Sequence, residues 1–264
     1  MGTISGQFGS TGAHPTFSCR TAHTFPMAQT GTFKHSGDLG DIIFSIPTIN
    51  ALGGGVLCLD PAGGESSPLF ARLGQPRTKL TMKSLNEVAP LLRMQKCIVD
   101  IVPWSGQKVK YDLDTFRDHI RFNNLCISHL QAFKLDHDLS KRPWLNFRYK
   151  RKLPKPFVIS RSPRYHGNYT FWVHQLTRIK NDAIFVGFEK EHEIFEYTFG
   201  HKIDFYPTPS ILDLAETINS AQTLFCNQGL PHAIAEALHH DLVCEMYRVY
   251  PAAVFGGKAT SKYF

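Results

Sequence analysis

The second half of this 264-residue chain alternates regularly between short apolar segments and amphipathic ones. Runs of β-branched and aromatic residues predict strands near residues 156–160, 183–187, 202–206, 222–226 and 242–246. Helical spacing of apolar residues predicts helices near 170–180, 189–199, 210–220 and 231–240. Strands that are separated by single helices form parallel sheets with right-handed crossovers. The sequence therefore predicts an α/β fold for this half.

The first half is less regular. A short strand and a helix over 41–52 are followed by three glycines, a strand near 56–60, a helix near 84–95 and a strand near 97–102. The stretch at 148–155 has the composition of a linker. We therefore expect an N-terminal domain over 32–150 and a C-terminal domain over 151–264. Residues 1–31 are rich in Gly, Ser and Thr, have no acidic residue, and are expected to form a mobile tail.

A Gly-Asp turn opens the first predicted helix. Asp41 follows Gly40 soon after the strand that contains Phe33, and Pro47 lies six residues further on. Open α/β sheets bind ligands at the carboxyl ends of their strands, so a carboxylate fixed here is a candidate general base. We expect the helix dipole to favour the ionised form of Asp41. The alternative is an Asp that only caps an ordinary helix.

A second strand, glycine turn and helix occur near the end of the chain. Gly229 follows an apolar run that ends at Phe225, and Pro231 suits the first turn of a helix. Backbone N–H groups at such a helix start bind anions such as a diphosphate, and His232 can add a donor. The alternative for His232 is a structural histidine with satisfied hydrogen bonds.

Together, the two turns resemble those of the heptosyltransferase-like glycosyltransferases, glycosyltransferase family nine. That family has the GT-B architecture, so the resemblance implies two Rossmann-like domains whose parallel sheets face a central cleft. It also implies that Asp41 is the catalytic base. It assigns the contact with the donor phosphates to the late turn, which here consists of Asn227, Gln228, Gly229 and His232. This chain has Asn where the family has Asp, which removes a charge from the donor site.

Two segments between these turns extend the resemblance. The strand and loop that begin at Phe157 are similar to the first strand and phosphate-binding loop of the family's second domain, and Trp172 follows at the expected place. The segment that begins at Phe185 is similar to the family's strand-Gly-x-x-Glu segment near the nucleotide. The resemblance implies these further donor-binding residues: Arg161, Ser162, Arg164, Gly187 and Glu189. It covers about residues 32–247 in patches, and the first domain is shorter than is usual in the family.

Composition excludes several other classes of protein. No apolar run is long enough to span a bilayer, and the first 31 residues lack a hydrophobic signal-peptide core. The six cysteines show no paired spacing, which favours a reducing compartment and hence the cytoplasm. The glycines at 53–55 follow a helix instead of joining a strand to one, and this position excludes a Rossmann dehydrogenase.

A basic stretch gives a hint about the acceptor. The formal net charge is +7, and residues 141–155 hold seven basic residues and no acid. Lys150, Arg151 and Lys152 have aromatic neighbours, a pattern that suits a phosphate backbone or an anionic glycolipid. A solvated linker explains the pattern equally well. If the stretch borders the cleft, the favoured acceptor is a polyanion, such as a modified DNA base or a phosphorylated lipopolysaccharide core, with Asp38 also on the acceptor side.

The sequence thus predicts an inverting, metal-independent glycosyltransferase that uses a nucleoside-diphosphate sugar as co-substrate and no other cofactor. Asp136 and Asp138 form an Asp-x-Asp pattern, but no clear strand precedes them, so no metal role is predicted. The alternative function is a non-catalytic nucleic-acid-binding protein on a GT-B-like scaffold. The nucleotide base, the sugar and the oligomeric state stay open.

Overall fold

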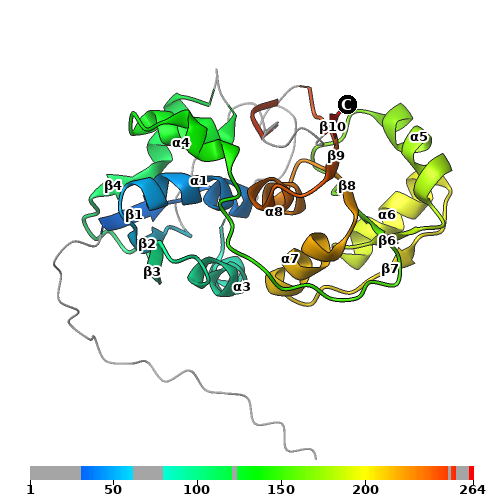
Figure 1. Cartoon of the computed structure of the whole chain (residues 1–264), viewed down its shortest axis with the longest axis horizontal. Coiled ribbons are helices and arrows are strands. Elements are labelled where there is room, and N and C mark those ends of the chain that lie inside the picture. The colour runs from blue at the N-terminus through cyan, green and yellow to red at the C-terminus, as the bar shows by residue number, and fades with distance from the viewer. Residues whose placement is uncertain (1–30, 62–79, 121–123, 249–250, 254–261) are drawn as a thin grey trace, which may run out of the picture.

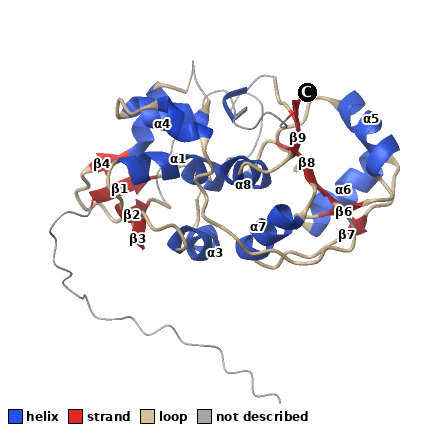
Figure 2. Ribbon diagram, viewed as in Figure 1, coloured by secondary structure: helices blue, strands red, loops and turns tan. Residues whose placement is uncertain are grey.

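The computed structural model describes residues 31–61, 80–120, 124–248, 251–253 and 262–264. Two parallel sheets lie side by side with helices between and around them (Figures 1 and 2). One sheet has four strands in the order β3-β2-β1-β4, and the other has six in the order β10-β9-β8-β5-β6-β7. The mobile tail predicted for residues 1–31 lies outside the described residues, except for Gly31, which begins β1.

The N-terminal lobe contains the four-stranded sheet. Its described elements, in chain order, are β1 (Gly31–His35), α1 (Leu39–Ala51), β2 (Gly55–Leu59), α3 (Met82–Arg93), β3 (Ile98–Pro103), β4 (Tyr111–Asp112), η1 (Leu113–Asp118), α4 (Leu125–Ala132) and η2 (His137–Lys141). The strand and helix positions that the sequence predicted up to residue 102 are confirmed to within a few residues. Helix α1 continues through Pro47, although a proline removes one helical hydrogen bond.

The C-terminal lobe contains the six-stranded sheet. Its described elements are β5 (Phe157–Ser160), α5 (Tyr169–Ile179), β6 (Ala183–Phe185), α6 (Glu189–Phe199), β7 (Asp204–Phe205), α7 (Ile211–Ser220), β8 (Thr223–Asn227), α8 (Leu230–Leu238), β9 (Leu242–Glu245), η3 (Pro251–Ala253) and β10 (Lys262–Tyr263). The predicted alternation of strands and helices is confirmed. The boundary predicted at 148–155 falls within the segment that connects η2 to β5.

The strand orders place a ligand crevice in each sheet. Read from β7, the six strands follow the order 3-2-1-4-5-6 of a complete doubly wound sheet. The four-stranded sheet follows the first part of the same order, 3-2-1-4. In such sheets ligands bind at the carboxyl ends of the strands where the order reverses. These positions are the ends of β1 and β4 in one lobe, and of β5 and β8 in the other.

The two lobes share one apolar core. A continuous cluster of buried side chains includes Phe33 of β1, Ile43 of α1, Ile234 of α8 and Leu224 of β8. Helix α1 packs against α8, and α3 packs against α7, so each contact joins one lobe to the other (Figure 1). A smaller cluster around Trp172 fills the side of the large sheet that faces α5 and α6. A wide opening of the lobes would therefore expose apolar surface and be costly.

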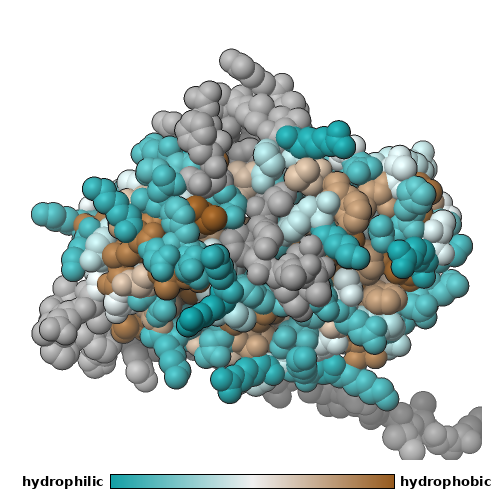
Figure 3. All heavy atoms as spheres, turned by 45° about the horizontal axis from the view of Figure 1, so that its top comes forward, coloured by the Kyte–Doolittle hydropathy of each residue, from teal (hydrophilic) through white to brown (hydrophobic). Residues whose placement is uncertain are grey.

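On the face shown in Figure 3, hydrophilic side chains are spread widely between smaller hydrophobic groups. Among the described residues, no helix has the length and apolar character that crossing a bilayer requires.

Candidate functional site

A cavity of about 550 Å³ lies between the lobes. Its walls come from the first turn of α1, the loops after β5, β6 and β8, and the first turns of α7 and α8, with Leu80, Thr81 and Ser84 near the start of α3. It therefore opens at the carboxyl ends of the strands, where the strand order predicts a ligand site. Among the predicted site residues, it is lined by Asp38, Asp41, Ser162, Arg164, Gly187, Asn227, Gln228, Gly229 and His232.

The first turns of α1 and α8 touch each other at this cavity. A Cβ built on Gly40 would lie 3.5 Å from the Cβ of Ala233 and 3.9 Å from the carbonyl oxygen of Gly229. The two glycine turns, which are far apart in the sequence, therefore lie side by side. Because unpaired backbone N–H groups and a partial positive charge gather at each helix start, this junction is suited to an anion.

The Gly-Asp turn holds the Asp41 side chain in one orientation. Asp38 is the N-cap of α1, and Asp41 is its third residue, not the capping residue. The Asp41 Oδ2 accepts a hydrogen bond from the Asp38 amide at 3.1 Å. Gly37 lies so close that a Cβ there would be 2.7 Å from this same oxygen. The turn thus requires glycine at 37 and leaves the other Asp41 oxygen without a hydrogen bond from the described residues.

Electrostatics at Asp41 differ from the sequence-based expectation. Burial, and then the neighbouring Asp38 carboxylate, raise the pKa of Asp41 to about 7, although Arg117 and Arg164 act in the opposite direction. The prediction that the helix dipole would dominate and favour the ionised form was wrong, because desolvation outweighs it. A carboxyl that titrates near neutral pH is well matched to general-base catalysis.

An ion pair crosses the cavity from one lobe to the other. Arg164, in the loop after β5, donates from both terminal nitrogens to Oδ2 of Asp38 at 3.2 Å. The two side chains are 23% and 37% exposed, so the pair is accessible to a competing anion. The Arg164 guanidinium also lies 5.0 Å from the ring of Tyr165.

Asn227 fixes the loop that carries Arg164. Its side-chain nitrogen donates to the carbonyl oxygens of Ser162 at 2.8 Å and Tyr165 at 3.0 Å. Its side-chain oxygen accepts from the Ser162 amide at 3.0 Å. An aspartate could not supply the two donors, so the departure from the family's residue has a structural reason. Gln228 has a similar role, because its oxygen accepts from the Tyr247 amide at 2.7 Å.

His232 is fully buried in the first turn of α8 and lines the cavity. Its ring lies 6.1 Å from the ring of Phe44 and 6.1 Å from that of Tyr263. Neither ring nitrogen has a hydrogen-bond partner among the described residues, and the nearest carboxylate, Glu236, is 4.0 Å away. Burial lowers the pKa of His232 to about 4, so the ring is neutral at pH 7. The alternative of a structural histidine with satisfied hydrogen bonds does not fit these contacts.

The loop after β6 brings a different glutamate to the cavity from the one predicted. Glu189 is exposed and does not line the cavity, whereas Glu191 does. Glu191 is the third residue of α6, and its Oε2 folds back to accept from the Phe188 amide at 3.1 Å. Burial raises the pKa of Glu191. Gly187 has φ of 134° and lies beneath this carboxylate, where a Cβ would be 2.7 Å from Oε2.

Arg161 does not reach the cavity. Its Nε donates to Oε2 of Glu245 at 2.9 Å, and the guanidinium packs over the rings of Trp172 and Phe199. Glu245 also accepts from the Trp172 indole at 2.6 Å. Burial alone would raise the pKa of Glu245, but its hydrogen bonds and the charge of Arg161 hold it below the usual value. The pair therefore supports the sheet, and among the described residues Arg164 is the arginine that lines the cavity.

The basic stretch does not line the cavity, and its first part lies at the far end of α8. Trp144 and Leu145 donate backbone hydrogen bonds to Ala237, in the last turn of that helix. Nine residues of helix span about 13 Å, which separates Trp144 and Leu145 from the first turn of α8. Arg151 is paired with Asp213 and Glu216 of α7, while Lys150 and Lys152 are exposed. The three predicted acceptor-binding residues Lys150, Arg151 and Lys152 are thus not brought to the cavity.

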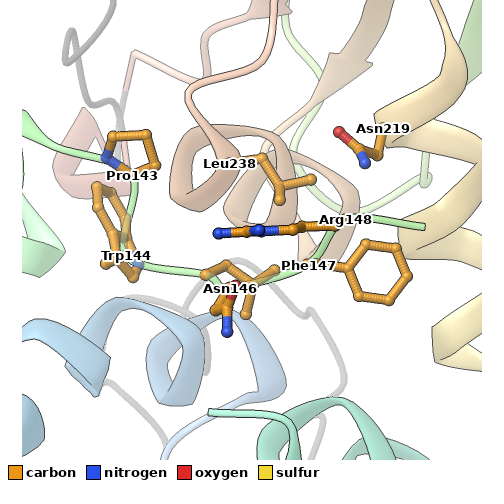
Figure 4. Close-up of a pocket in the computed structure, with 8 residues that line it drawn as sticks. Pro143, Trp144, Asn146, Phe147, Arg148, Asn219 and Leu238 are labelled. Carbon is orange, nitrogen blue, oxygen red and sulfur yellow. The ribbon is translucent and has the colours of Figure 1, made fainter. Parts of the chain in front are cut away.

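A second hollow of about 300 Å³ lies beside this stretch (Figure 4). Trp144, Asn146 and Phe147 of the connecting segment line it together with Asn219 of α7 and Leu238 of α8. The Trp144 indole donates to the carbonyl oxygen of Ile43 at 3.1 Å, so the hollow marks where the connecting segment is fastened to α1.

The Asp-x-Asp pattern has a local structural role. Asp136 is the N-cap of η2 and accepts from the Asp138 amide at 2.9 Å. Asp138 in turn pairs with Lys141 at 2.6 Å. Neither aspartate lines the cavity. Within the described ranges, no group of three or more His, Cys, Asp or Glu side chains is arranged to hold a metal ion.

Comparison with known proteins supports the fold. No protein-family model and no curated protein matches the sequence. Among solved structures, the heptosyltransferase WaaC of E. coli with ADP is similar, with 9% identity, a TM-score of 0.53, and coverage of 88% of this chain and 92% of WaaC. The iron-containing dodecameric glycosyltransferase TibC of enterotoxigenic E. coli has 14% identity, a TM-score of 0.51, and coverage of 88% of this chain and 62% of TibC. TibC with ADP-D-beta-D-heptose has 12% identity, a TM-score of 0.52, and coverage of 85% and 60%.

These similarities confirm the predicted GT-B-like α/β fold and, at the level of the fold, the resemblance to heptosyltransferase-like glycosyltransferases. The match in structure establishes the architecture. At sequence identities of 9–14% it does not establish the chemistry, which depends on the residues of the cavity.

Proposed function

We propose that this protein is a glycosyltransferase that transfers a sugar from a nucleoside diphosphate to an acceptor hydroxyl, with inversion at the anomeric carbon. The cavity between α1 and α8 would hold the donor. Asp41 would act as the general base, while Arg164, His232 and the first turn of α8 would bind the diphosphate.

The observation that carries this proposal is the environment of His232. A buried polar group without a hydrogen bond costs about 1–3 kcal/mol, so His232 calls for a partner, which a ligand in the cavity would supply. His232 is buried in the first turn of α8, where backbone N–H groups favour an anion. A neutral imidazole can donate one hydrogen bond to a phosphate oxygen. Asp41 lines the same cavity, in the helix start that α8 touches.

The proposed reaction is a single displacement. The acceptor oxygen forms a bond with the anomeric carbon as the bond from that carbon to the diphosphate oxygen breaks. Asp41 takes the proton of the acceptor hydroxyl, and the leaving diphosphate takes the bonding electron pair. Arg164 and the helix start would stabilise the charge that develops on the diphosphate. A base that titrates near pH 7 suits this transfer.

The nucleoside would extend from the diphosphate toward the loops after β6 and β7. Gly187 leaves room for the side chain of Glu191, which lines the cavity and offers carboxylate oxygens that suit ribose hydroxyls. Phe188, Ile211 and Leu214 supply apolar surface for a base. Adenosine diphosphate is the first nucleotide to test, because the similar structures of WaaC and TibC contain ADP and ADP-D-beta-D-heptose.

The acceptor is proposed only as a hydroxyl compound. The basic stretch that suggested a polyanion does not line the cavity, and three of its cations already have carboxylate partners: Lys141, Arg151 and Lys155. A polyanionic acceptor, such as DNA or an anionic glycan, would have to span from the exposed Lys150 and Lys152 to the cavity. It therefore stays a prediction that needs its own measurement.

Thermal shifts with ADP, GDP and UDP test the donor site. Binding stabilises the folded protein by an amount set by ligand concentration over affinity, so one diphosphate should raise the melting temperature. The Arg164→Gln variant should lose most of that shift. Salt-sensitive DNA binding without any response to nucleotides would favour the nucleic-acid-binding alternative.

Kinetics of Asp41→Asn test the chemistry. General-base catalysis contributes about 10²–10⁴-fold, so kcat should fall within that range while donor affinity is kept. Release of the nucleoside diphosphate from a nucleotide-sugar, with water as acceptor, provides an assay before the natural acceptor is known. An unchanged kcat in Asp41→Asn would remove this residue from the base role.

A further inference from the structure

Two buried histidines lie directly beneath the Gly-Asp turn, and the proposed reaction does not use either of them. His35 is the last residue of β1, and His129 lies in the last turn of α4. Both are fully buried, and their Nε2 atoms are 3.1 Å apart. The ring of Phe116 stacks on His129 with a centroid distance of 4.1 Å. Nothing in the sequence pattern indicated that these residues meet.

The hydrogen bonds determine which nitrogen of each ring carries the proton. His129 Nδ1 lies 2.7 Å from the carbonyl oxygen of Leu125, so it must donate. His129 Nε2 is then an acceptor, and His35 Nε2 must donate to it. His35 Nδ1 is left as an acceptor, and the Gly37 amide donates to it at 2.9 Å. One unbroken chain of hydrogen bonds therefore runs from α4 to the turn.

This chain needs both rings to be neutral. A proton added to either ring would place two N–H groups opposite each other or remove the acceptor of the Gly37 amide. Burial lowers the pKa of His35 to about 4, and it holds that of His129 well below its usual value. The charged groups whose fields act on the pair are Lys34, Asp114 and Arg117.

Three consecutive amides of the turn are each held by a side chain. The Ser36 amide donates to Oδ1 of Asp114 at 2.9 Å, the Gly37 amide to His35, and the Asp38 amide to Asp41. A Cβ on Gly37 would lie 2.6 Å from His35 Cε1 and 2.7 Å from Asp41 Oδ2. Gly37 is thus enclosed between the imidazole on one side and the carboxylate on the other. A shift of the imidazole would move the turn and, with it, Asp41.

We propose that His35 and His129 form a positioning pair that fixes the Gly37 turn and thereby aims the Asp41 carboxylate at the acceptor hydroxyl. The inference rests on the proposed function. Misplacing a catalytic group by about 1 Å can reduce a rate by about 100-fold, so loss of the pair should act on kcat. Donor affinity should stay near the parent value, because the diphosphate ligands belong to the other lobe.

Two substitutions at His35 separate the hydrogen bond from simple packing. In His35→Asn, the side-chain oxygen takes the approximate place of Nδ1 and can still accept from Gly37. In His35→Leu, the volume is similar but the acceptor is lost. We expect His35→Leu to lower kcat by about 10- to 100-fold with donor Kd changed less than about 2-fold. His35→Asn should recover most of that loss.

A packing control and a second measurement make the result decisive. Leu92→Ala, in the last turn of α3, removes a buried side chain and should lower stability without lowering kcat. Hydrogen exchange of the Gly37 amide should be protected in the parent and in His35→Asn, and faster in His35→Leu. Equal kcat in both His35 variants and the parent, or equal Gly37 protection in all three, would overturn the positioning role. If the parent itself transfers no sugar, the proposed function fails, and the exchange data still decide whether the pair holds the turn.

Discussion

The glycosyltransferase family that this chain resembles has Asp at the position of Asn227. The structure nevertheless predicts that the substitution Asn227→Asp destabilises this protein. Asn227 is 3% exposed, and its amide nitrogen donates to the carbonyl oxygens of Ser162 and Tyr165. An aspartate would keep the oxygen that accepts from the Ser162 amide. It would lose both donors and would direct a carboxylate oxygen at two carbonyl oxygens.

The magnitude follows from these contacts. Each of the two lost hydrogen bonds contributes about 0.5–1.5 kcal/mol, and each acceptor that becomes unsatisfied adds a desolvation penalty of about 1 kcal/mol or more. We therefore expect the free energy of unfolding to fall by about 3–5 kcal/mol. A protein of this size loses about 2–4 °C in melting temperature per kcal/mol, so the shift should exceed about 5 °C.

Urea unfolding of Asn227→Asp against the parent measures the effect, with Asn124→Asp as a matched control. Asn124 is the N-cap of α4, and among the described residues its side chain makes one hydrogen bond, in which its oxygen accepts from the Ile127 amide at 2.8 Å. Asp is as good a cap as Asn, so the control should change stability by less than about 0.5 kcal/mol. ADP affinity should also fall in Asn227→Asp, because the loop with Arg164 loses its support. Equal or higher stability of Asn227→Asp would refute the role of Asn227 in fixing the loop that carries Arg164.

Three further predictions concern the site and its charges. Asp38→Asn should increase affinity for ADP by about 2- to 5-fold, because it removes a charge that competes for Arg164 while keeping a good helix cap; calorimetry that shows weaker binding would contradict this. Lys150→Gln combined with Lys152→Gln should leave donor affinity unchanged, and it should raise the acceptor KM in a salt-dependent way only for a polyanionic acceptor. Stability should fall from pH 6.5 toward 4, because unfolding lets the three buried histidines take up protons that the native state excludes. Native Asp41 opposes this with one proton of its own, so these four groups together leave an excess of two protons, which contributes at most about 2.7 kcal/mol per pH unit in urea titrations.

The fold was predictable where its signals are local. The strands and helices after residue 156 follow from apolar periodicity and turn residues, and they agree with the structure. The stretch from 103 to 148 carries no such period, because its described elements are the two-residue β4, two 3-10 helices and the eight-residue α4. Packing against α1 and the strand ends holds these elements in place, and that information is not local.

The site was predictable where a glycine turn marks it, as at Gly40 and Gly229. Arg161 and Arg164 look equivalent in the sequence, and only the structure shows that Glu245 of a distant strand takes the first and leaves the second at the cavity. Glu191 had a usable local signal, since the third residue of a helix often folds back onto the cap. The pairing of His35 with a histidine 94 residues away had none.

The charge state expected for Asp41 was wrong because a local rule was applied to a residue whose surroundings come from distant parts of the chain. A carboxylate at a helix start is normally stabilised in its charged form. At Asp41 this effect is outweighed by burial between the lobes and by Asp38, neither of which the sequence alone reveals. The same contact between lobes produces the cavity, so the pKa near 7 and the proposed catalytic role have a common structural origin.

A crystal structure of the protein with bound ADP tests the central claim most directly. The proposed function predicts density for the diphosphate at the first turn of α8, within hydrogen-bonding distance of His232 and Arg164, with Asp38 released from the arginine. The base should lie between the loops after β6 and β7. ADP bound at the hollow beside Trp144, or at the cavity with its diphosphate directed away from α8, would contradict the account.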